Sequence, residues 1–496
     1  MPHLGLVGQT GGRRKLYRYC YPGPDCPVAG AGLSASIGRR ALSSGPWSPG
    51  DSLAVESGQD GIIMSEIIII GAGLAGLSTA FHLGRNYQIF EKESEVGGLC
   101  RSFEIHGFTF DYTGHLLHMR NDYTKSLVAW LLPDAFASPS RRAYIYSQGT
   151  YTEYPFQANT YGLPKEVIKE CIAGFVETCM KYPDGAPPSD FLSFEDWVYQ
   201  TFGAGIARHF MIPYNQKLWR IPLREITADW VSWSVPRPTL DEILNGALGI
   251  KNRAFGYNPS FLYPKQGGIR QLPESFVRHI RDLHLKRKVV EISLQARTVR
   301  FEDNALYSYE ALVSTMPLPC LLKSIQDLPE EIRKAGESLR YLSIYDVNLG
   351  VKRPHISDKH WIYFPEPEFI FYRVGFPMNY APQTLPKGCS SLYVEVSHLP
   401  GQHIPEPRLL NEVLAGLTRC GILRDDDEIL ASHIVDIPCA YVIHDRSRQE
   451  ALKIIRPFLE SQHIYTVGRY GQWEYSSMEQ AILSGRDLAL KLHSRR

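Results

Sequence analysis

Residues 66–83 read EIIIIGAGLAGLSTAFHL, and this stretch decides the fold. Four successive isoleucines predict a strand that is buried on both faces. Gly71, Gly73 and Gly76 follow the strand at GxGxxG spacing, ahead of an amphipathic helix. In a nucleotide-binding turn the first glycine permits the bend, the second lets a pyrophosphate approach the backbone, and the third lets helix and strand pack closely. The order of strand, turn and helix therefore favours a dinucleotide site over an ordinary buried strand.

A second strand is predicted over residues 87–90. Glu91 follows it directly, twenty residues after Gly71. A carboxylate at this place accepts a hydrogen bond from a ribose 2′-hydroxyl and disfavours a 2′-phosphate. Gly97 and Gly98 come next, with Arg101 close behind, and the chain has no second complete GxGxxG motif for a separate NAD domain. We therefore expect FAD rather than NAD as the tightly held cofactor.

The chain of 496 residues is long enough for about three domains. Its net charge of +1 gives no reason to expect a nucleic-acid partner. Nine cysteines without a CxxC pair indicate a reducing compartment, the cytoplasm, and no zinc site or other metal. The longest apolar run is too short to span a membrane, so no transmembrane segment is expected.

Residues 1–63 are rich in Gly, Ser, Pro and Arg and are predicted to be disordered. Two interpretations compete: an Arg-rich organelle-targeting peptide, or non-native sequence upstream of an initiator at Met64. The second is favoured because several prolines, Pro22 and Pro46 among them, interrupt the amphipathic helix that targeting requires. The folded region is expected to begin near Met64.

Changes of periodicity along the rest of the chain predict an α/β fold with three parts. Helical spacing is concentrated in the middle, and alternating, aromatic-rich segments lie on both sides of it. The parts are a discontinuous Rossmann-like FAD-binding domain (64–116, 260–320 and 460–496), a helical domain (164–250) and an antiparallel-sheet substrate domain (117–163 and 321–459).

From Met64 to its end the chain resembles the flavin-dependent UDP-galactopyranose mutase family, within the wider class of amine oxidases and protoporphyrinogen oxidase. The segments that support the resemblance occur in the family's order: GAGLAGLSTA (71–80), GGLCRS (97–102), DYTGHLLH (111–118), EYPFQANTYGLPKE (153–166), PYNQKLW (213–219), YPKQGGI (263–269), LVSTMP (312–317), WIYFP (361–365), FYRVGF (371–376) and GRYGQWEY (468–475).

In that family the flavin must be reduced, and its N5 attacks the anomeric carbon of a nucleotide-activated sugar. The sugar ring then opens and recloses between pyranose and furanose forms without net redox. The resemblance thus implies a mutase that acts on a nucleotide sugar for cell-surface polysaccharide synthesis, with NAD(P)H as the candidate external reductant.

The resemblance also implies roles for individual residues. The catalytic candidates are His115, Tyr363, Arg373, Tyr441 and Tyr475. The substrate-binding candidates are Tyr154, Phe156, Gln157, Asn215 and Trp219. The cofactor-binding candidates are Gly71, Gly73, Ala75, Gly76, Glu91, Gly97, Gly98, Arg101, Gly114, Gly468, Arg469, Met478 and Gln480.

Two positions depart from the family pattern. Thr113 replaces the first glycine of the usual Gly-Gly-His loop, which is expected to stiffen it. Two arginines grip the pyrophosphate in the family; Arg373 matches one, but Ile212 stands where the other belongs. Either Arg237 or Lys217 compensates, or the donor is bound differently, or the substrate is not a diphosphate.

The lost arginine keeps a second function open, that of a redox flavoenzyme such as an oxidase or desaturase of the amine-oxidase class. A third alternative is a flavin-binding protein without turnover. The sequence names neither the sugar nor the oligomeric state.

Overall fold

The computed structural model describes residues 62–182, 193–231, 235–256 and 259–494. Disorder is predicted for residues 1–63; residues 1–61 lie outside these ranges, and for Ile62 and Ile63 the prediction is wrong because they form part of a strand. The first strand, β1 (Ile62–Ile70), begins two residues before the expected start, because Ile62 and Ile63 pair with Leu306 and Tyr307 of β12.

The first sheet contains the glycine-turn strand at its centre. Its order is β10–β11–β12–β1–β2–β9, and β18 also pairs with β12. β1 is parallel to both β2 and β12, as expected for a nucleotide-binding sheet. The strands are β1, β2 (Tyr87–Phe90), β9 (Leu283–His284), β10 (Val289–Ser293), β11 (Thr298–Phe301), β12 (Leu306–Ser314) and β18 (Ile464–Thr466).

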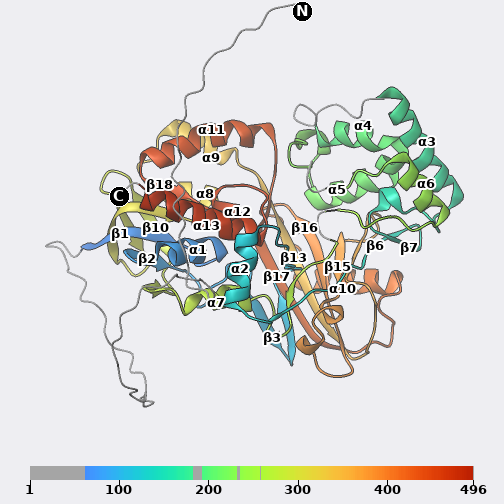
Figure 1. The fold of residues 1–496 in the computed structure, drawn as a ribbon, viewed down its shortest axis with the longest axis horizontal. Coiled ribbons are helices and arrows are strands. Elements are labelled where there is room, and N and C mark those ends of the chain that lie inside the picture. The colour runs from blue at the N-terminus through green and yellow to red at the C-terminus, as the bar shows by residue number, and fades with distance from the viewer. Residues whose placement is uncertain (1–61, 183–192, 232–234, 257–258, 495–496) are drawn as a thin grey trace, which may run out of the picture. The chain divides into compact units, whose positions relative to one another are not determined.

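Helices cover both faces of this sheet. Ile67 and Ile69 pack into a core with α1 (Leu74–Leu83), α7 (Gln271–Val277) and α13 (Met478–His493). Ile68 and Ile70 point to the opposite core, with α8 (Leu318–Ser324), α9 (Glu330–Glu337) and α11 (Arg446–Ser461). α1 and α13 lie side by side (Figure 1). The predicted burial of β1 on both faces is confirmed.

The second sheet has seven strands in the order β17–β13–β16–β15–β14–β6–β7. All neighbours are antiparallel except β14 and β6. α10 (Glu406–Arg419) packs on one face. The strands are β6 (Ala143–Ser147), β7 (Thr150–Glu153), β13 (Tyr341–Val351), β14 (Trp361–Tyr363), β15 (Arg373–Gly375), β16 (Ser390–His398) and β17 (Ile429–Val442). The predicted α/β fold class is confirmed.

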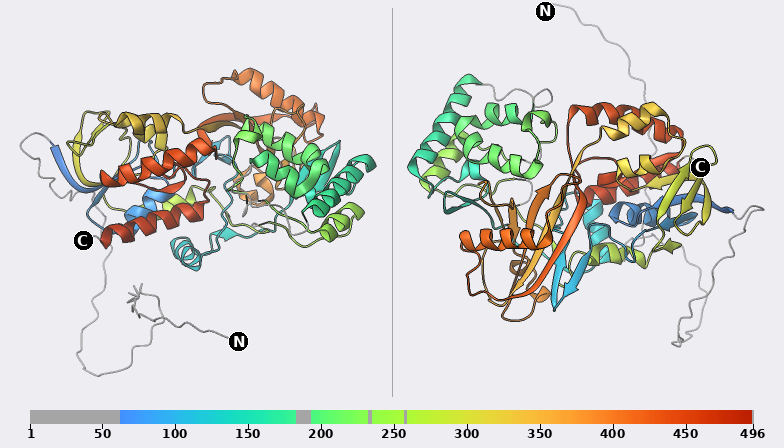
Figure 2. Two further views of the ribbon diagram at one scale, coloured as in Figure 1. Left: turned by 90° about the horizontal axis from the view of Figure 1, so that it is seen from above. Right: turned by 180° about the vertical axis from the view of Figure 1, so that it is seen from behind.

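A helical group is inserted between β7 and the return of the chain to the first sheet. It consists of α3 (Lys165–Lys181), α4 (Phe194–Ile206), η3 (Ala207–Met211), α5 (Ile212–Trp219), η4 (Leu223–Glu225) and α6 (Leu240–Leu248). A Cβ added to Gly205 would lie 2.1 Å from the carbonyl oxygen of Glu170, so glycine lets α3 and α4 approach closely. The green helices stay together in both views of Figure 2.

The remaining short elements connect these three parts. They are β3 (Ser102–Ile105), β4 (Phe108–Asp111), α2 (Asp122–Leu131), β5 (Phe136–Ala137), η1 (Phe156–Ala158), β8 (Tyr263–Pro264), η5 (Pro377–Asn379), η6 (Pro382–Thr384) and α12 (Gly468–Gly471). No helix in the described part of the chain combines the length and apolar character needed to cross a bilayer. The exact domain boundaries remain a prediction.

Candidate functional site

The three motif glycines meet different surroundings. Gly71 has φ +98°, and a Cβ on it would lie 2.1 Å from Thr315 Oγ1. A Cβ on Gly76 would lie 1.9 Å from the carbonyl oxygen of Gly71. At Gly73, which precedes the first turn of α1, the nearest atoms to an added Cβ are 3.9 Å away. Gly71 and Gly76 are therefore needed by the fold, whereas Gly73 leaves room at a helix N-terminus, where a phosphate binds favourably.

Glu91 is buried at the end of β2 and faces the glycine turn. Its carboxylate accepts hydrogen bonds from the backbone N–H of Ala72 at 2.8 Å and of Glu93 at 3.0 Å. A carboxylate has about four acceptor positions, so Glu91 can hold the turn and still accept from a ribose hydroxyl.

The second glycine pair lies against the first. Gly97 donates its N–H to the carbonyl oxygen of Ala72 at 2.8 Å. Arg101 Nε donates to the carbonyl oxygen of Gly98 at 2.8 Å, and its guanidinium lies 4.8 Å from the centroid of the Tyr112 ring. The first of these contacts joins the backbone of the Gly97–Gly98 turn to that of the Gly71–Gly73 turn.

Two C-terminal segments meet α1 at the same place. A Cβ on Gly468, which has φ +75°, would lie 2.6 Å from Ala75 Cβ. Ser477 caps α13, and Gln480 completes a capping box with its side chain and its N–H. Gln480 therefore has a structural partner, while Met478 is the first residue of α13. Their predicted contacts with the flavin remain predictions.

Four polar side chains form a row across the second sheet. The strand register places Asp346 of β13 opposite Glu395 of β16, and Glu395 opposite Arg373 of β15. Arg373 in turn lies opposite Tyr363 of β14. Directly opposed residues of neighbouring strands point to the same face. The row thus brings together two carboxyl groups, one guanidinium and one phenol.

Arg373 is anchored by an ion pair, but not all of its N–H donors are used. Its Nη2 forms an ion pair with the carboxylate of Glu395, which is fully buried. Its Nε has no hydrogen-bond partner among the described residues. A buried unpaired donor is costly, so this N–H is suited to bind an anionic ligand.

The predicted histidine loop is tied to the same row. Thr113 donates its backbone N–H to Asp346 Oδ2 at 2.9 Å, and it does so at φ +66°, a left-handed conformation that β-branched residues avoid. At Gly114, an added Cβ would lie 2.1 Å from the hydroxyl of Tyr393, so no larger residue fits there.

The surroundings of His115 favour its neutral imidazole form. Burial, followed by the positive charge of Arg469, lowers the pKa of His115 to about 4. Its Nδ1 is buried and has no hydrogen-bond partner among the described residues. The ring can therefore exchange a hydrogen bond with a ligand without first losing a proton at neutral pH.

Arg469 lies against two of the predicted catalytic tyrosines. Its guanidinium is 4.6 Å from the ring centroid of Tyr475 and 5.1 Å from that of Tyr441. The two rings are stacked with centroids 6.0 Å apart. Arg469 Nη1 and Nη2 donate to the carbonyl oxygens of Ser476 and Ala440, each at 3.2 Å. The contacts fix a positive charge beside a wall of aromatic rings.

Two predicted substrate residues each contact one of the predicted catalytic tyrosines. The ring of Tyr154 lies 5.6 Å from that of Tyr363, and the ring of Trp219 lies 6.0 Å from that of Tyr441. Trp219 belongs to a hydrophobic core against which Tyr154, Tyr363 and Tyr441 also pack.

The other three predicted substrate residues have structural partners. Phe156 is fully buried. Gln157 Nε2 donates to the carbonyl oxygen of Pro236 at 2.8 Å, and Asn215 Nδ2 donates to that of Met211 at 2.7 Å, one turn earlier. Their role in substrate binding stays a prediction.

A flavin fits these residues. The room at Gly73, the carboxylate of Glu91 and the unpartnered nitrogens of His115 and Arg373 are separate features that such a cofactor would satisfy. Gly71, Gly73, Glu91, Gly97 and Gly98 would hold the nucleotide, and His115 and Arg469 would adjoin the ring system. The bound flavin would supply the reactive isoalloxazine.

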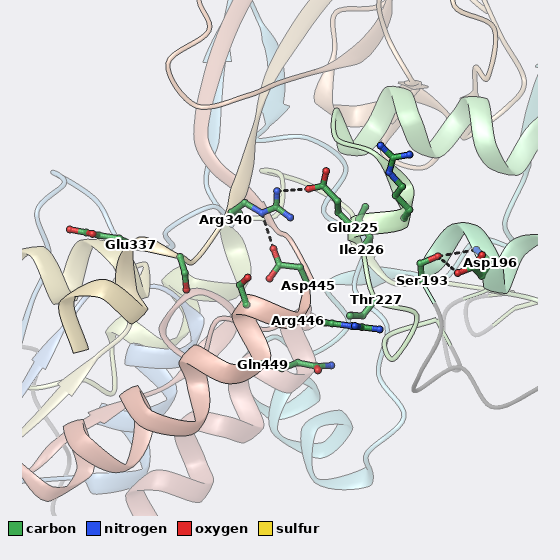
Figure 3. Close-up of a pocket in the computed structure, with 13 residues that line it drawn as sticks. Ser193, Asp196, Glu225, Ile226, Thr227, Glu337, Arg340, Asp445, Arg446 and Gln449 are labelled. Atoms are coloured by element: carbon green, nitrogen blue, oxygen red, sulfur yellow. Dashed lines mark hydrogen bonds and ion pairs between the residues drawn. The ribbon is translucent and has the colours of Figure 1, made fainter. Parts of the chain in front are cut away.

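A separate surface hollow of about 730 Å³ lies where the starts of α4 and α11 meet η4, and no predicted site residue lines it. Arg340 bridges Glu225 and Asp445 there, each at 2.8 Å (Figure 3). These ion pairs connect η4 of the helical group to the start of α11.

Sequence reasoning missed Asp346 and Glu395. The available signal was a single acid within an apolar strand, IYDVNLGV (344–351) and LYVEVS (392–397). Acids at such positions are almost never buried unless they are paired. The pairing itself depends on strand register, which one sequence does not reveal.

The glycine turn, the acidic strand end and the buried cations define a flavin-binding enzyme with a Rossmann-like sheet. The chain belongs to the flavin containing amine oxidoreductase family, whose profile matches residues 74–492. FAD is accordingly its cofactor.

Relatives and solved structures point in two directions. The chain is 22% identical to a zeta-carotene-forming phytoene desaturase of Myxococcus xanthus, over 68% of this chain and 72% of that protein. It is 24% identical to a 4,4′-diapolycopene oxygenase of Methylomonas sp, over 81% and 93%. A crystal structure of reduced UDP-galactopyranose mutase is similar with a TM-score of 0.82 and 27% identity, over 88% of this chain and 95% of that one.

Proposed function

We propose that the protein is a mutase that uses reduced FAD to interconvert the pyranose and furanose forms of a nucleotide-activated sugar. The observation that best supports this function is the row of Arg373 and Tyr363 beside the buried acids, with an unpartnered Nε on the arginine. An arginine that is anchored on one edge presents its other donors in a fixed direction, which suits a phosphate oxygen. The likeness to reduced UDP-galactopyranose mutase supports the same function.

The residues divide the work of such a reaction. Arg373 would bind the diphosphate, and Tyr363 would donate a phenolic hydrogen bond beside it. Tyr441 and Tyr475 would exclude water from the reacting carbon. Arg469 would stabilise negative charge on the reduced ring system, and His115, being neutral, would accept or donate a hydrogen bond there.

A second function, that of an FAD-dependent oxidase or desaturase, is favoured by one observation. Ile212, where the family has an arginine, packs against the same hydrophobic core as Tyr154, Tyr363 and Tyr441, so the surroundings of that position are apolar. The names of the sequence relatives, a desaturase and an oxygenase, are in line with an apolar substrate. A third alternative is flavin binding without turnover.

Anaerobic spectroscopy separates these functions. We expect nucleotide sugars to perturb the flavin spectrum of the oxidised enzyme without bleaching it, and amines and polyenes to have no effect. An oxidase or desaturase would bleach with its substrate and release hydrogen peroxide when air is admitted. Bleaching by an amine or polyene would replace the proposed function with the redox one.

The remaining features of the proposal follow from the reaction. NAD(P)H would serve as external reductant, and a reducing compartment such as the cytoplasm would keep the flavin reduced. The product would enter cell-surface polysaccharide synthesis.

A further inference from the structure

Neither Lys217 nor Arg237, the two candidates for replacing the arginine absent at residue 212, is available for this role. Lys217 Nζ donates to the carbonyl oxygens of Phe364 at 2.8 Å and of Phe371 at 3.2 Å, so it is committed to the backbone. Arg237 is exposed and lies 5.3 Å from the ring centroid of Trp197, a buried residue of α4. Both cations already have structural partners.

Arg141 lies against the ring of Tyr154, which contacts Tyr363. It stands two residues before β6, and its guanidinium lies 4.7 Å from the ring centroid of Tyr154. Its Nη2 donates to the carbonyl oxygen of Phe255 at 2.6 Å, and its backbone N–H donates to that of Pro259 at 3.0 Å. Backbone and side chain are thus both fixed, as required of a preorganised binding group.

Arg141 and Arg373 both lie near the Tyr154–Tyr363 ring pair. Tyr154 contacts Tyr363, and Arg373 lies opposite Tyr363 across β14 and β15. Burial raises the pKa of Tyr363, whereas the positive charges of Arg373 and Arg141 both oppose that rise. The positive charges of two guanidiniums from different elements therefore both stabilise the ionised form of the same phenol.

We propose that Arg141 supplies the second cationic contact to the diphosphate of the substrate, in place of the arginine that Ile212 replaces. The inference rests on the proposed function, because it presumes a substrate that bears phosphate. Arginine suits the role because its planar guanidinium carries five N–H donors in a rigid fork that matches the oxygens of a phosphate.

Binding of UDP and of uridine to the FAD-loaded protein tests this role. Loss of one charge-assisted contact should weaken UDP binding about tenfold or more. Uridine lacks phosphate, so its affinity should not change. The variants are Arg141→Ala and Arg141→Gln; the glutamine amide can still donate to the carbonyl of Phe255. Arg142→Ala, which removes a neighbouring exposed arginine, should bind UDP like the wild type.

A second substitution can restore the lost cation. Ile212→Arg in the Arg141→Ala background should restore most of the lost UDP affinity, because it puts a cation back at the family's position. Flavin absorbance and melting temperature identify a variant that has lost its fold, in which case Arg141→Gln decides.

The remaining outcomes overturn the inference in distinguishable ways. Equal loss of UDP and uridine binding would make Arg141 a packing residue beside Tyr154. Loss of UDP binding in Arg373→Ala but not in Arg141→Gln would refute this inference and leave the proposed function intact. A wild-type protein that binds neither UDP nor the other nucleoside diphosphates would refute both.

Discussion

Gly73 and Gly76 lie three residues apart, yet a side chain should have opposite consequences at the two positions. We expect Gly73→Val to fold, because the protein has room for a Cβ at this position. The variant should be colourless, because the valine side chain would occupy the space that the pyrophosphate of the flavin needs. Gly76→Ala should instead lose about 2–4 kcal/mol of stability, since its Cβ would overlap the backbone of Gly71. Flavin absorbance and thermal melting of both variants check this. A yellow Gly73→Val protein would refute the assignment of the loop.

Asp346 should make stability depend on pH. Burial, followed by the charge of Glu395, raises the pKa of Asp346 from 3.8 to about 8, with Arg373 opposing the rise. Between about pH 4 and pH 8 the folded state keeps a proton that the unfolded state has lost, so stability falls as pH rises through this window.

The variant Asp346→Asn removes this titration and keeps an oxygen for the Thr113 N–H. Its melting temperature should vary less between pH 5 and pH 8 than that of the wild type, as measured by calorimetry in matched buffers. Parallel melting curves for the two proteins would show that Asp346 is already ionised at neutral pH.

At the scale of the loop, Thr113 should store strain. A β-branched residue at φ +66° is unfavourable, so Thr113→Gly should stabilise the protein by about 1 kcal/mol. Denaturant unfolding measures the gain. Asn86→Gly is the matched control, because asparagine tolerates its φ of +61° and should gain little. A destabilised Thr113→Gly variant would mean that the threonine side chain contributes more than the conformation costs.

The sequence predicts those features of the site that depend on local spacing. The glycine turn and β1 follow from a motif of a dozen residues, and their geometry matches the assigned roles of Gly71 and Gly76. The Asp346–Glu395–Arg373 row joins strands that are far apart in the chain, so only the fold reveals it.

Some side chains that the sequence assigned to ligand binding form hydrogen bonds with nearby backbone groups instead. Asn215 bonds to the carbonyl oxygen one turn earlier, and Gln480 completes a capping box. Polar side chains at helix ends and in helices commonly satisfy backbone groups. A family motif does not distinguish these structural uses from ligand binding, because both call for the same residue types.

At the scale of the whole molecule, the described fold begins at Ile62 rather than at Met64. We expect a chain that starts at Ile62 to keep the flavin content and melting temperature of the full chain, because residues 1–61 have little apolar surface to bury. Removing Ile62 and Ile63 as well breaks their pairing with β12 and should cost about 1 kcal/mol without loss of flavin. Flavin loss in the first truncation would assign the N-terminal residues to the fold.

The central claim is that the whole protein positions a reduced flavin for isomerisation rather than oxidation. The most direct measurement supplies dithionite-reduced enzyme, without oxygen, with UDP-galactopyranose and related nucleotide sugars and follows their ring forms by anion-exchange chromatography. We expect many turnovers per reduced flavin, no consumption of reductant, and no turnover by the oxidised enzyme. Unchanged nucleotide sugars, together with an oxidised enzyme that turns over another substrate and releases hydrogen peroxide, would contradict the central claim.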